Sequence, residues 1–538
     1  MKKKLLIDFL ISLSLSNLLF VFGRGSISAM PSHYHNYAES YIFLQHPFIL
    51  SIFLLALLFF SLTQIDRYFN KGAVSIIGKS GFMIFVLAIL HEIRVYIFAS
   101  TSQIIAIQNW IGENFPRLIY LLIFGIFGVI LAYFGFRYFQ KTITAAKHFI
   151  LILTPFFCLT FSNYVNETFV FNNSWELQKK YISNQILQPK ALTDKSSSNR
   201  VVWIIFDEFD YRVAFESHFV NLPELLKFKE TAVSTSQALS PAHNTLQSIP
   251  SLLTGNIVEK TEYIGIDDLK LFYSDGTSTN FKSYEGLFSN LYQSNKKIGV
   301  VGTYHPYCRI FGDKLKYCID YTYHYEESKS STDRKYSITD LIKHHVSTSL
   351  TYFPFWYRTF DEGKLSEDSF ANYYNAYQTA TESSKSIAAR DDFDMVFLHI
   401  LIPHSPFIYN SETERFDGSG NYLMNLKLAD KMFGEIRKSM EDSGVWDNST
   451  VIISSDHSWR IDNGGAIETT DPAYTATDGG KYDPRVPFII KLKRQKDAVT
   501  FDKPVNTVIT SEIIVNIFGN NIKTPEDLMK FLESNSLK

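Results

Sequence analysis

The chain has 538 residues, and its 52 lysine and arginine residues against 54 aspartate and glutamate residues give a net charge of −2. This balance leaves no excess of basic charge to attract a polyanion, so nucleic acid is not expected as a partner. The length suffices for two or three domains. Long runs of leucine, isoleucine and phenylalanine are concentrated in the first 165 residues. We therefore expect a membrane part followed by a soluble part.

Five apolar stretches near the N-terminus are each long enough to cross about 30 Å of hydrocarbon. They cover residues 5–23, 41–63, 80–99, 118–136 and 149–165. The first follows a run of lysines, as a signal peptide would, but no small-x-small cleavage site closes it and four more stretches follow. The sequence therefore predicts a transmembrane bundle of five helices over residues 1–165, with an uncleaved first helix.

The basic residues of the short loops predict the orientation of this bundle. Three segments on one side of the bundle each carry a cluster of basic residues. These are Lys2, Lys3 and Lys4 before the first stretch, Arg67, Lys71 and Lys79 between the second and third, and Arg137, Lys141 and Lys147 between the fourth and fifth. The other two loops hold only Arg24 and Arg117. Basic clusters mark the cytoplasmic side, so we expect a multi-pass protein of the cytoplasmic (inner) membrane. An odd number of spans then places the C-terminal part on the extracytoplasmic, periplasmic side.

Two of the three cysteines are close in sequence. Cys308 and Cys318 flank Gly312 and Asp313, where the chain can turn back on itself. Spacing alone leaves a disulfide and two free thiols equally open. The predicted extracytoplasmic location favours the disulfide, because disulfides persist in oxidising compartments. Cys158 lies inside an apolar run and is interpreted as a buried hydrophobic residue.

After a polar linker over residues 166–199, residues 200–538 have the pattern of a soluble α/β domain. Apolar, β-branched runs predict strands within residues 200–208, 297–304, 394–404, 449–457 and 485–493. Helical spacing appears between them, as at residues 425–443, where apolar residues recur every fourth position. Strands alternating with helices indicate a mostly parallel sheet covered on both faces.

Acids and histidines follow three of the predicted strands, where a parallel sheet places its ligands. They are Asp207 with Glu208, His404, and Asp456 with His457. A single carboxylate there is usually a cap or turn former. Three such strand ends in one sheet instead offer the mixed oxygen and nitrogen ligands of a divalent cation. Glu208 is equally open as a further ligand or a mere neighbour.

The segment SPAHNTLQSIPSLLTG over residues 240–255 offers several hydroxyl nucleophiles. It resembles the nucleophile region of the sulfatase and alkaline-phosphatase superfamily, in which sulfatases carry a cysteine ten residues before the glycine of a Leu-Leu-Thr-Gly ending. Counting back from Gly255 gives Thr245. The resemblance continues in order through Asp207–Glu208, LIPHSPF, GVWDNSTVIISSDHS and KYDPRVPFII, and it covers residues 200–519. It implies an alkaline-phosphatase-like fold.

The chain departs from sulfatases at the nucleophile. Sulfatases need cysteine or serine there, followed by proline and arginine, so that the residue can be oxidised to an aldehyde. Here Thr245 is followed by Gln247 and Ile249, and threonine cannot form that aldehyde. Threonine is the nucleophile in phosphoethanolamine transferases and in the lipoteichoic-acid synthase or phosphoglycerol transferase group. These enzymes resemble the chain in architecture as well, because five spans precede their extracytoplasmic catalytic domain.

This resemblance implies one divalent metal ion, which could be Zn, Mn, Mg or Ca, held by Asp207, Asp456 and His457 together with Thr245. Thr245 is expected to attack a phosphodiester, with an ordinary helix N-cap as the alternative role of this residue. His404 is expected to bind phosphate or protonate the leaving oxygen. Lys481 and Arg485 are candidates for holding phosphate charge. A second metal is not predicted, and His399, inside a strand, is interpreted as structural.

Three functions remain open. The first is a transferase that moves a phospho-alcohol group from a phospholipid donor to a glycan or lipid acceptor of the cell envelope. The second is a hydrolase, either a phosphodiesterase or an atypical sulfatase, which would use water as the acceptor. The third is a catalytically inactive envelope-assembly protein, which the intact set of candidate site residues argues against.

Overall fold

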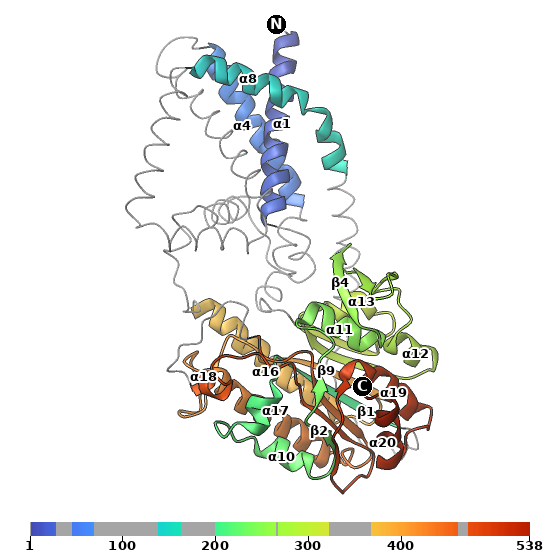
Figure 1. Cartoon of the computed structure of the whole chain (residues 1–538). Helices are drawn as coiled ribbons and strands as arrows, with labels where there is room; N and C mark the ends of the chain where they lie inside the picture. The colour runs from blue at the N-terminus through green and yellow to red at the C-terminus, as the bar shows by residue number, and fades with distance from the viewer. Residues whose placement is uncertain are drawn as a thin grey trace. The chain divides into compact units, whose positions relative to one another are not determined.

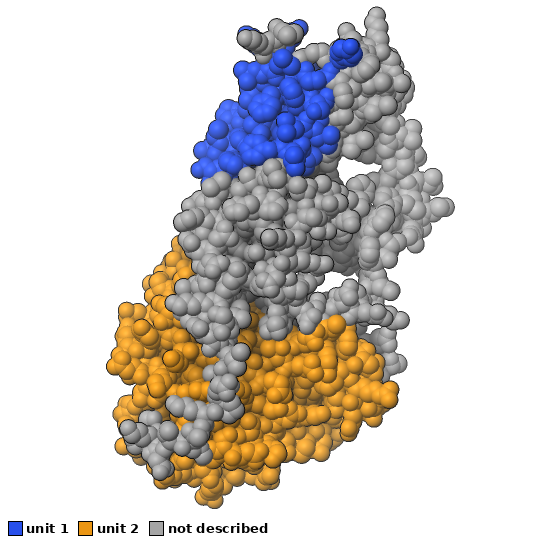
Figure 2. Space-filling model, turned by 180° about the vertical axis from the view of Figure 1, so that it is seen from behind, with its two compact units in different colours: residues 1–33, 37–173, 333–364 blue, residues 34–36, 174–332, 365–538 orange. Residues whose placement is uncertain are grey.

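The computed structural model describes residues 2–27, 46–68, 138–162, 199–264, 267–321, 367–460 and 472–537. The chain forms two compact units (Figure 2). The first comprises residues 1–33, 37–173 and 333–364, and the second comprises residues 34–36, 174–332 and 365–538. Each unit is described by itself.

The described part of the first unit is helical. It contains α1 (Lys2–Ile27), α4 (His46–Tyr68) and α8 (Phe139–Ile152). Polar side chains join α1 to the segment that follows α8: Ser14 Oγ donates to Thr154 Oγ1 over 3.0 Å, and Asn17 Nδ2 donates to Thr160 Oγ1 over 3.0 Å. Such hydrogen bonds between otherwise apolar helices fix which faces pack together.

Among the described residues, no single helix meets the length and apolarity needed to cross a membrane. One pair of helices, over residues 144–152 and 155–162, meets that requirement jointly, with a bend of 52° between them. The predicted stretches at residues 80–99 and 118–136 lie outside the described residues. The five-helix transmembrane bundle therefore stays a prediction.

The described part of the second unit is coloured from green to red in Figure 1. It is built on an eight-stranded sheet with the strand order β14-β2-β13-β12-β1-β9-β7-β8. Its strands are β1 (Val201–Asp207), β2 (Val233–Thr235), β7 (Ile298–Thr303), β8 (Tyr317–Tyr321), β9 (Met395–Pro403), β12 (Thr450–Ser455), β13 (Phe488–Lys491) and β14 (Val499–Phe501). Only β13 runs antiparallel to its neighbours. The prediction of a mostly parallel α/β sheet is confirmed.

Both faces of the sheet are covered, which explains why its strands are apolar throughout. In β1 the side chains of Val202, Ile204 and Phe206 belong to one core, and those of Val201, Trp203 and Ile205 belong to the other. The first core is closed by α10 (Pro223–Lys229), α16 (Glu367–Ala388), α17 (Tyr422–Asp442) and α18 (Pro472–Ala476). The second is closed by α11 (Thr245–Thr254), α12 (Leu287–Gln293), α13 (Tyr307–Phe311), α19 (Thr510–Phe518) and α20 (Pro525–Ser534).

Smaller elements complete the unit. A three-stranded sheet contains β4 (Val258–Tyr263), β5 (Leu269–Tyr273) and β6 (Ser278–Asn280). Two two-stranded sheets pair β10 (Tyr409–Asn410) with β11 (Arg415–Phe416), and β3 (Ala238–Leu239) with β15 (Val505–Asn506). A π-helical turn spans Arg212–Glu216 and a 3₁₀ turn spans Thr507–Ile509.

Cys308 and Cys318 form a disulfide between α13 and β8. Both cysteines are buried, and the backbone N–H of Cys308 donates to Asp320 Oδ2 over 2.9 Å. The bridge closes the short connection between two consecutive elements. It therefore fixes α13 against the edge of the sheet. Cys158, interpreted from the sequence as buried, is exposed in the described part of the helical unit.

Candidate active site

Two neighbouring parallel strands deliver the acids of the site. Asp207 is the last residue of β1, and Asp456 and His457 follow β12 directly. The two strands are paired up to Phe206 and Ser455, so their carboxyl ends meet at one edge of the sheet. All three side chains are completely buried. The sheet topology thus brings together residues that are about 250 positions apart in the sequence.

Thr245 enters the same edge from the start of α11. The N-cap of this helix is Asn244, whose side chain accepts from the backbone N–H of Gln247, so Thr245 is the first helical residue and not the cap. Its side chain is 3% exposed, and its Oγ1 lies 3.2 Å from His457 Nε2. The buried His305 donates from Nε2 to the carbonyl oxygen of Thr245 over 3.1 Å.

The tautomer of His457 follows from its surroundings. Its Nδ1 lies 2.9 Å from the carbonyl oxygen of Ser458, which can only accept, so Nδ1 carries the proton. Nε2 therefore offers a lone pair, and it lies 3.6 Å from Asp207 Oδ1 and 3.4 Å from Asp456 Oδ2. Burial and the nearby Arg460 lower the pKa of His457 to about 3, which keeps the ring neutral.

Three of the four carboxylate oxygens of Asp207 and Asp456 lack a hydrogen-bond partner among the described residues. Asp456 Oδ1 accepts from the backbone N–H of His457 over 2.8 Å, whereas Asp456 Oδ2 and both oxygens of Asp207 have no hydrogen-bond partner among the described residues. Burial raises the pKa of Asp207 well above its usual range, with help from the Asp456 and Glu208 carboxyls. Buried carboxylates facing a nitrogen lone pair are electrostatically unfavourable unless a cation lies between them. The residues present therefore fit a divalent metal ion.

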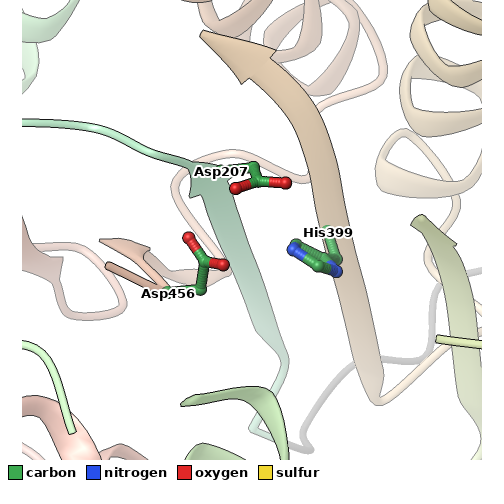
Figure 3. A group of neighbouring side chains, drawn as sticks. All are labelled: Asp207, His399 and Asp456. Atoms are coloured by element: carbon green, nitrogen blue, oxygen red, sulfur yellow. The ribbon is translucent and has the colours of Figure 1, made fainter. Parts of the chain in front are cut away.

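His399 belongs to this cluster, although its position inside a strand suggested a structural role (Figure 3). Ligand atoms of Asp207, His399 and Asp456 lie within 4.8 Å of one another. The register of β9 explains this: His399 pairs with Ile205, two residues before Asp207, so both side chains point to the same face. From the sequence alone, the side chains of His399 and Asp207 could be placed on the same face of the sheet only by knowing which residues of β1 and β9 are paired.

A second layer of polar residues lies beside the buried acids. Arg460 Nε donates to Glu208 Oε1 over 2.7 Å, and Arg460 Nη2 donates to His404 Nε2 over 3.1 Å. His404 Nδ1 donates to the carbonyl oxygen of Ser405. Burial opposes the charge of Arg460, but Glu208 outweighs this and raises the pKa of the guanidinium. Sequence reasoning missed Arg460, although it follows His457 by three positions.

The two other predicted substrate-binding residues have different surroundings. The guanidinium of Arg485 donates to both oxygens of Glu216 over 2.7 and 2.8 Å, and to Asp483. These two carboxylates raise the pKa of Arg485 further above its usual range. Lys481 is exposed, and its carbonyl oxygen accepts from Arg212. The structure thus brings Thr245, Asp207, Asp456, His457, Glu208 and His404 together, whereas Arg485 is engaged by Glu216 and Asp483.

The model of the sulfatase family matches residues 199–518, which is more than half of the chain. The chain belongs to the sulfatase family. No curated protein matches this sulfatase-family chain. The match spans all eight strands of the main sheet. It identifies the second unit as that of a sulfatase-like enzyme of the alkaline phosphatase superfamily, whose members use a divalent metal.

Solved structures with a related fold include phosphonate monoester hydrolases. The enzyme of Agrobacterium radiobacter is 13% identical, with 63% of this chain and 78% of that chain covered and a TM-score of 0.39. That of Silicibacter pomeroyi is 12% identical, with 62% and 77% covered and a TM-score of 0.41. An alkaline phosphatase superfamily protein of Vibrio parahaemolyticus is 12% identical, with 66% and 77% covered and a TM-score of 0.37.

Proposed function

We propose that this sulfatase-family member is a metal-dependent phosphotransferase with Thr245 as its nucleophile. In this proposal it moves a phospho-alcohol group, phosphoethanolamine or phosphoglycerol, from a phospholipid to a glycan or lipid of the cell envelope. One observation carries it: the Thr245 hydroxyl lies 3.2 Å from His457 Nε2, beside two buried aspartates, Asp207 and Asp456, with three carboxylate oxygens that have no hydrogen-bond partner among the described residues. A helix N-cap or a core threonine does not require such a setting.

The identity of the nucleophile favours phosphoryl over sulfuryl chemistry. The aldehyde nucleophile of sulfatases forms by oxidation of a cysteine or serine, whose Cβ is bonded to only one heavy atom besides Cα. Threonine carries a methyl group on Cβ, so its oxidation would give a ketone. Thr245 therefore acts as an alcohol, and an alcohol is competent for attack on phosphorus once its hydroxyl is activated.

In the first step, Thr245 Oγ attacks the phosphorus of the donor phosphodiester. A bond from phosphorus to Oγ forms, and the ester bond from phosphorus to the diacylglycerol oxygen breaks. A divalent ion held by Asp207, Asp456 and His457 would supply Lewis acidity, which lowers the pKa of the hydroxyl and offsets phosphate charge. Because His457 Nε2 and Asp207 would hold the ion, they are not the acceptors of the Thr245 proton, which passes to solvent water as the hydroxyl oxygen attacks.

His404 and Arg460 are placed to handle the remaining charge. Arg460 donates to His404 Nε2 over 3.1 Å, so this nitrogen cannot release a proton while that bond persists. A bound phosphate gives the guanidinium a stronger partner, because hydrogen bonds between two charged groups are the strong ones. Once Arg460 has turned to the phosphate, His404 Nε2 can be protonated beside Glu208 Oε2, which is 4.0 Å away, and can donate to the leaving oxygen.

In the second step, a hydroxyl of the acceptor attacks the phospho-threonine. The bond from phosphorus to Thr245 Oγ breaks, a new phosphodiester forms on the acceptor, and the threonine recovers a proton. Water in place of the acceptor would give a hydrolase by the same steps. We favour transfer because the predicted membrane bundle would present the enzyme to phospholipids, and the predicted orientation would place it on the periplasmic side.

The experiment is to trap the covalent intermediate. Full-length protein in detergent is incubated with phosphatidylethanolamine or phosphatidylglycerol, quenched in acid and digested. Mass spectrometry should find phosphoethanolamine or phosphoglycerol on Thr245. Diacylglycerol release that persists in Thr245→Ala, with no modified peptide in the wild type, would contradict the nucleophile assignment. Envelope glycans and lipids from cells with the wild type or Thr245→Ala then distinguish transfer, which adds a headgroup to one of them, from hydrolysis, which does not.

A further inference from the structure

His399 is a buried polar residue near the site to which the proposed mechanism gives no role. Its side chain is completely buried, and its Nε2 has no hydrogen-bond partner among the described residues. Leaving a buried nitrogen without a partner costs about 1–3 kcal/mol. Such an arrangement within a well-packed core needs a specific reason, and the three groups in Figure 3 suggest one, since the imidazole and the two carboxyls face a common space.

The other ring nitrogen of His399 determines the tautomer. Nδ1 lies 3.1 Å from the carbonyl oxygen of Thr303 and 2.8 Å from the hydroxyl of Tyr307. The Thr303 carbonyl oxygen can only accept, so Nδ1 carries the proton, the Tyr307 hydroxyl oxygen accepts from the same N–H, and Nε2 carries the lone pair. A ring nitrogen of His399 and carboxylate oxygens of Asp207 and Asp456 lie within 4.8 Å of one another, and Nε2 is the ring nitrogen that Thr303 and Tyr307 leave unengaged.

Histidines that bind metals usually have this pattern, in which the second nitrogen donates to a backbone carbonyl and so fixes the ligating tautomer. We propose that His399 Nε2 is a protein ligand of the metal centre, sharing Asp207 and Asp456 with His457, and that Tyr307 is the positioning residue that holds its ring. This inference rests on the proposed metal-dependent function, and it adds a second imidazole to the centre predicted from the sequence.

The surroundings of Tyr307 are built to hold it still. Its ring is completely buried and lies against Gly302, where an added Cβ would come within 2.5 Å of the ring carbons. Phe397 precedes His399 by two residues in β9, and its ring packs edge-on against Tyr307 with ring centroids 5.5 Å apart. The Cys308–Cys318 disulfide begins at the next residue. Tyr307 therefore has little freedom to rotate away from His399.

The test uses full-length protein with Co²⁺ as the probe, because the visible spectrum of Co²⁺ reports the number and type of its ligands. His399→Ala and His399→Asn should lower Co²⁺ affinity more than 10-fold and change the spectrum of the bound ion. Tyr307→Phe should weaken binding by about 10-fold or more, as expected for loss of an outer hydrogen bond to a ligand. Zn²⁺ competition titrations give the corresponding affinities for zinc.

Tyr321→Phe is the matched control. Tyr321 is also fully buried, and its hydroxyl donates over 3.5 Å to the backbone carbonyl of His399 instead of its ring. This variant removes a hydroxyl of similar burial beside the same histidine, and it should bind Co²⁺ with the affinity and spectrum of the wild type. A loss equal to that of Tyr307→Phe would show that general loosening of the core explains the effect, and would overturn the positioning role.

A measurement on the wild type protects the test against variants that do not fold. X-ray absorption of the Zn²⁺-loaded protein, combined with the measured zinc content, should find two imidazoles per chain. One imidazole per chain, or wild-type Co²⁺ affinity and spectrum in folded His399→Asn, would overturn the proposal. The variant Asp456→Ala distinguishes a wrong ligand assignment for His399 from a wrong metal-dependent function. It should abolish metal binding whether or not His399 is a ligand. If Asp456→Ala still bound the metal, the proposed metal-dependent mechanism itself would be wrong.

Discussion

Thr245 Oγ1 and His457 Nε2 lie 3.2 Å apart although 212 residues separate them in the chain. The first residue comes from the N-terminus of α11 and the second from the end of β12. Because His457 Nδ1 donates to Ser458, the nitrogen that faces the threonine can only accept in the neutral ring. The hydroxyl is therefore held in a defined direction inside a buried, carboxylate-lined site before any substrate arrives.

Replacing this hydroxyl should separate chemistry from folding. Thr245→Ala should lower turnover by roughly 10³-fold or more, because the covalent step loses its nucleophile. Thr245→Ser keeps a hydroxyl and should retain measurable turnover. Steady-state release of diacylglycerol from phosphatidylglycerol or phosphatidylethanolamine measures both, with thermal unfolding as the control for folding. Equal activity in the alanine and serine variants would mean that the hydroxyl has no covalent role.

Removing the metal should destabilise the second unit. The Asp207 and Asp456 carboxylates then face the His457 lone pair with no cation between them. An ion that binds only the folded state stabilises it by an amount that grows with the logarithm of the ion concentration over its Kd. Dialysis against a chelator should lower the Tm, and added Zn²⁺ or Mn²⁺ should restore it. Asp456→Ala should show a Tm that does not respond to metal. A wild-type Tm unaffected by chelation, in protein shown to be metal-free, would argue against a resident ion.

The two arginines near the site should behave differently. Arg460 contacts Glu208 and His404, whereas Arg485 is held by Glu216 and Asp483. Arg460→Gln should raise KM by about 10-fold or more, because a charge-assisted contact to phosphate is worth about 1.5–3 kcal/mol. Arg485→Gln should mainly lower the Tm. Michaelis–Menten kinetics and thermal unfolding measured on both variants test this contrast, and the reverse pattern would return the phosphate-binding role to Arg485.

The sequence predicted the elements that form the centre of the sheet, because burial on both faces leaves a continuous apolar run. The predicted strands at residues 200–208, 297–304, 394–404 and 449–457 correspond to β1, β7, β9 and β12. The predicted helix face of Leu428, Met432, Ile436 and Met440 is completely buried in α17. The edge strands β8 and β14, and β2 next to β14, were not predicted, because three to five residues carry too little periodicity.

Site residues could be predicted from the sequence where they lie at the end of a strand. They could not be predicted where their position depends on the register between two strands. Asp207, Asp456 and His457 stand at strand ends, which is visible in the sequence. His399 enters the cluster only because it pairs with Ile205, and this register is a property of two strands about 190 residues apart. Arg460 depends on the path of the chain after β12, which no local pattern specifies. Long-range register and loop conformation are therefore what sequence reasoning lacked.

Removing the Cys308–Cys318 disulfide should weaken the connection between α13 and β8. Its loop is short, with a sequence separation of 10, so chain entropy predicts a loss of about 2–3 kcal/mol in the free energy of unfolding. Denaturant unfolding of the Cys308→Ser, Cys318→Ser double variant measures this loss. Wild-type protein assayed with and without a reductant provides the comparison without mutation, and stability that is indifferent to both treatments would contradict a structural role for the bridge.

Lys491 offers a test of buried charge away from the site. It is 1% exposed in β13, and its Nζ lies 3.4 Å from the carbonyl oxygens of Trp446 and Leu492. Burial lowers its pKa to about 8 from 10.5, so the folded state binds fewer protons than the unfolded state between these values. Stability associated with this group is therefore fully present only above pH 10.5, and it is lost as the pH falls through 8.

The variant Lys491→Met should remove that dependence. At pH 7 the charged lysine is the destabilised form, so the methionine variant should be more stable by about 1–3 kcal/mol, and this difference should shrink as the pH rises from 8 toward 10.5. Denaturant unfolding of both proteins at pH 7, 8, 9 and 10 measures the difference directly, and other titrating groups cancel in the comparison. Lys496→Met, which removes an exposed lysine paired with Asp447, is the control and should show no such trend. A constant difference across this range would mean that the ammonium group of Lys491 is fully compensated inside the fold.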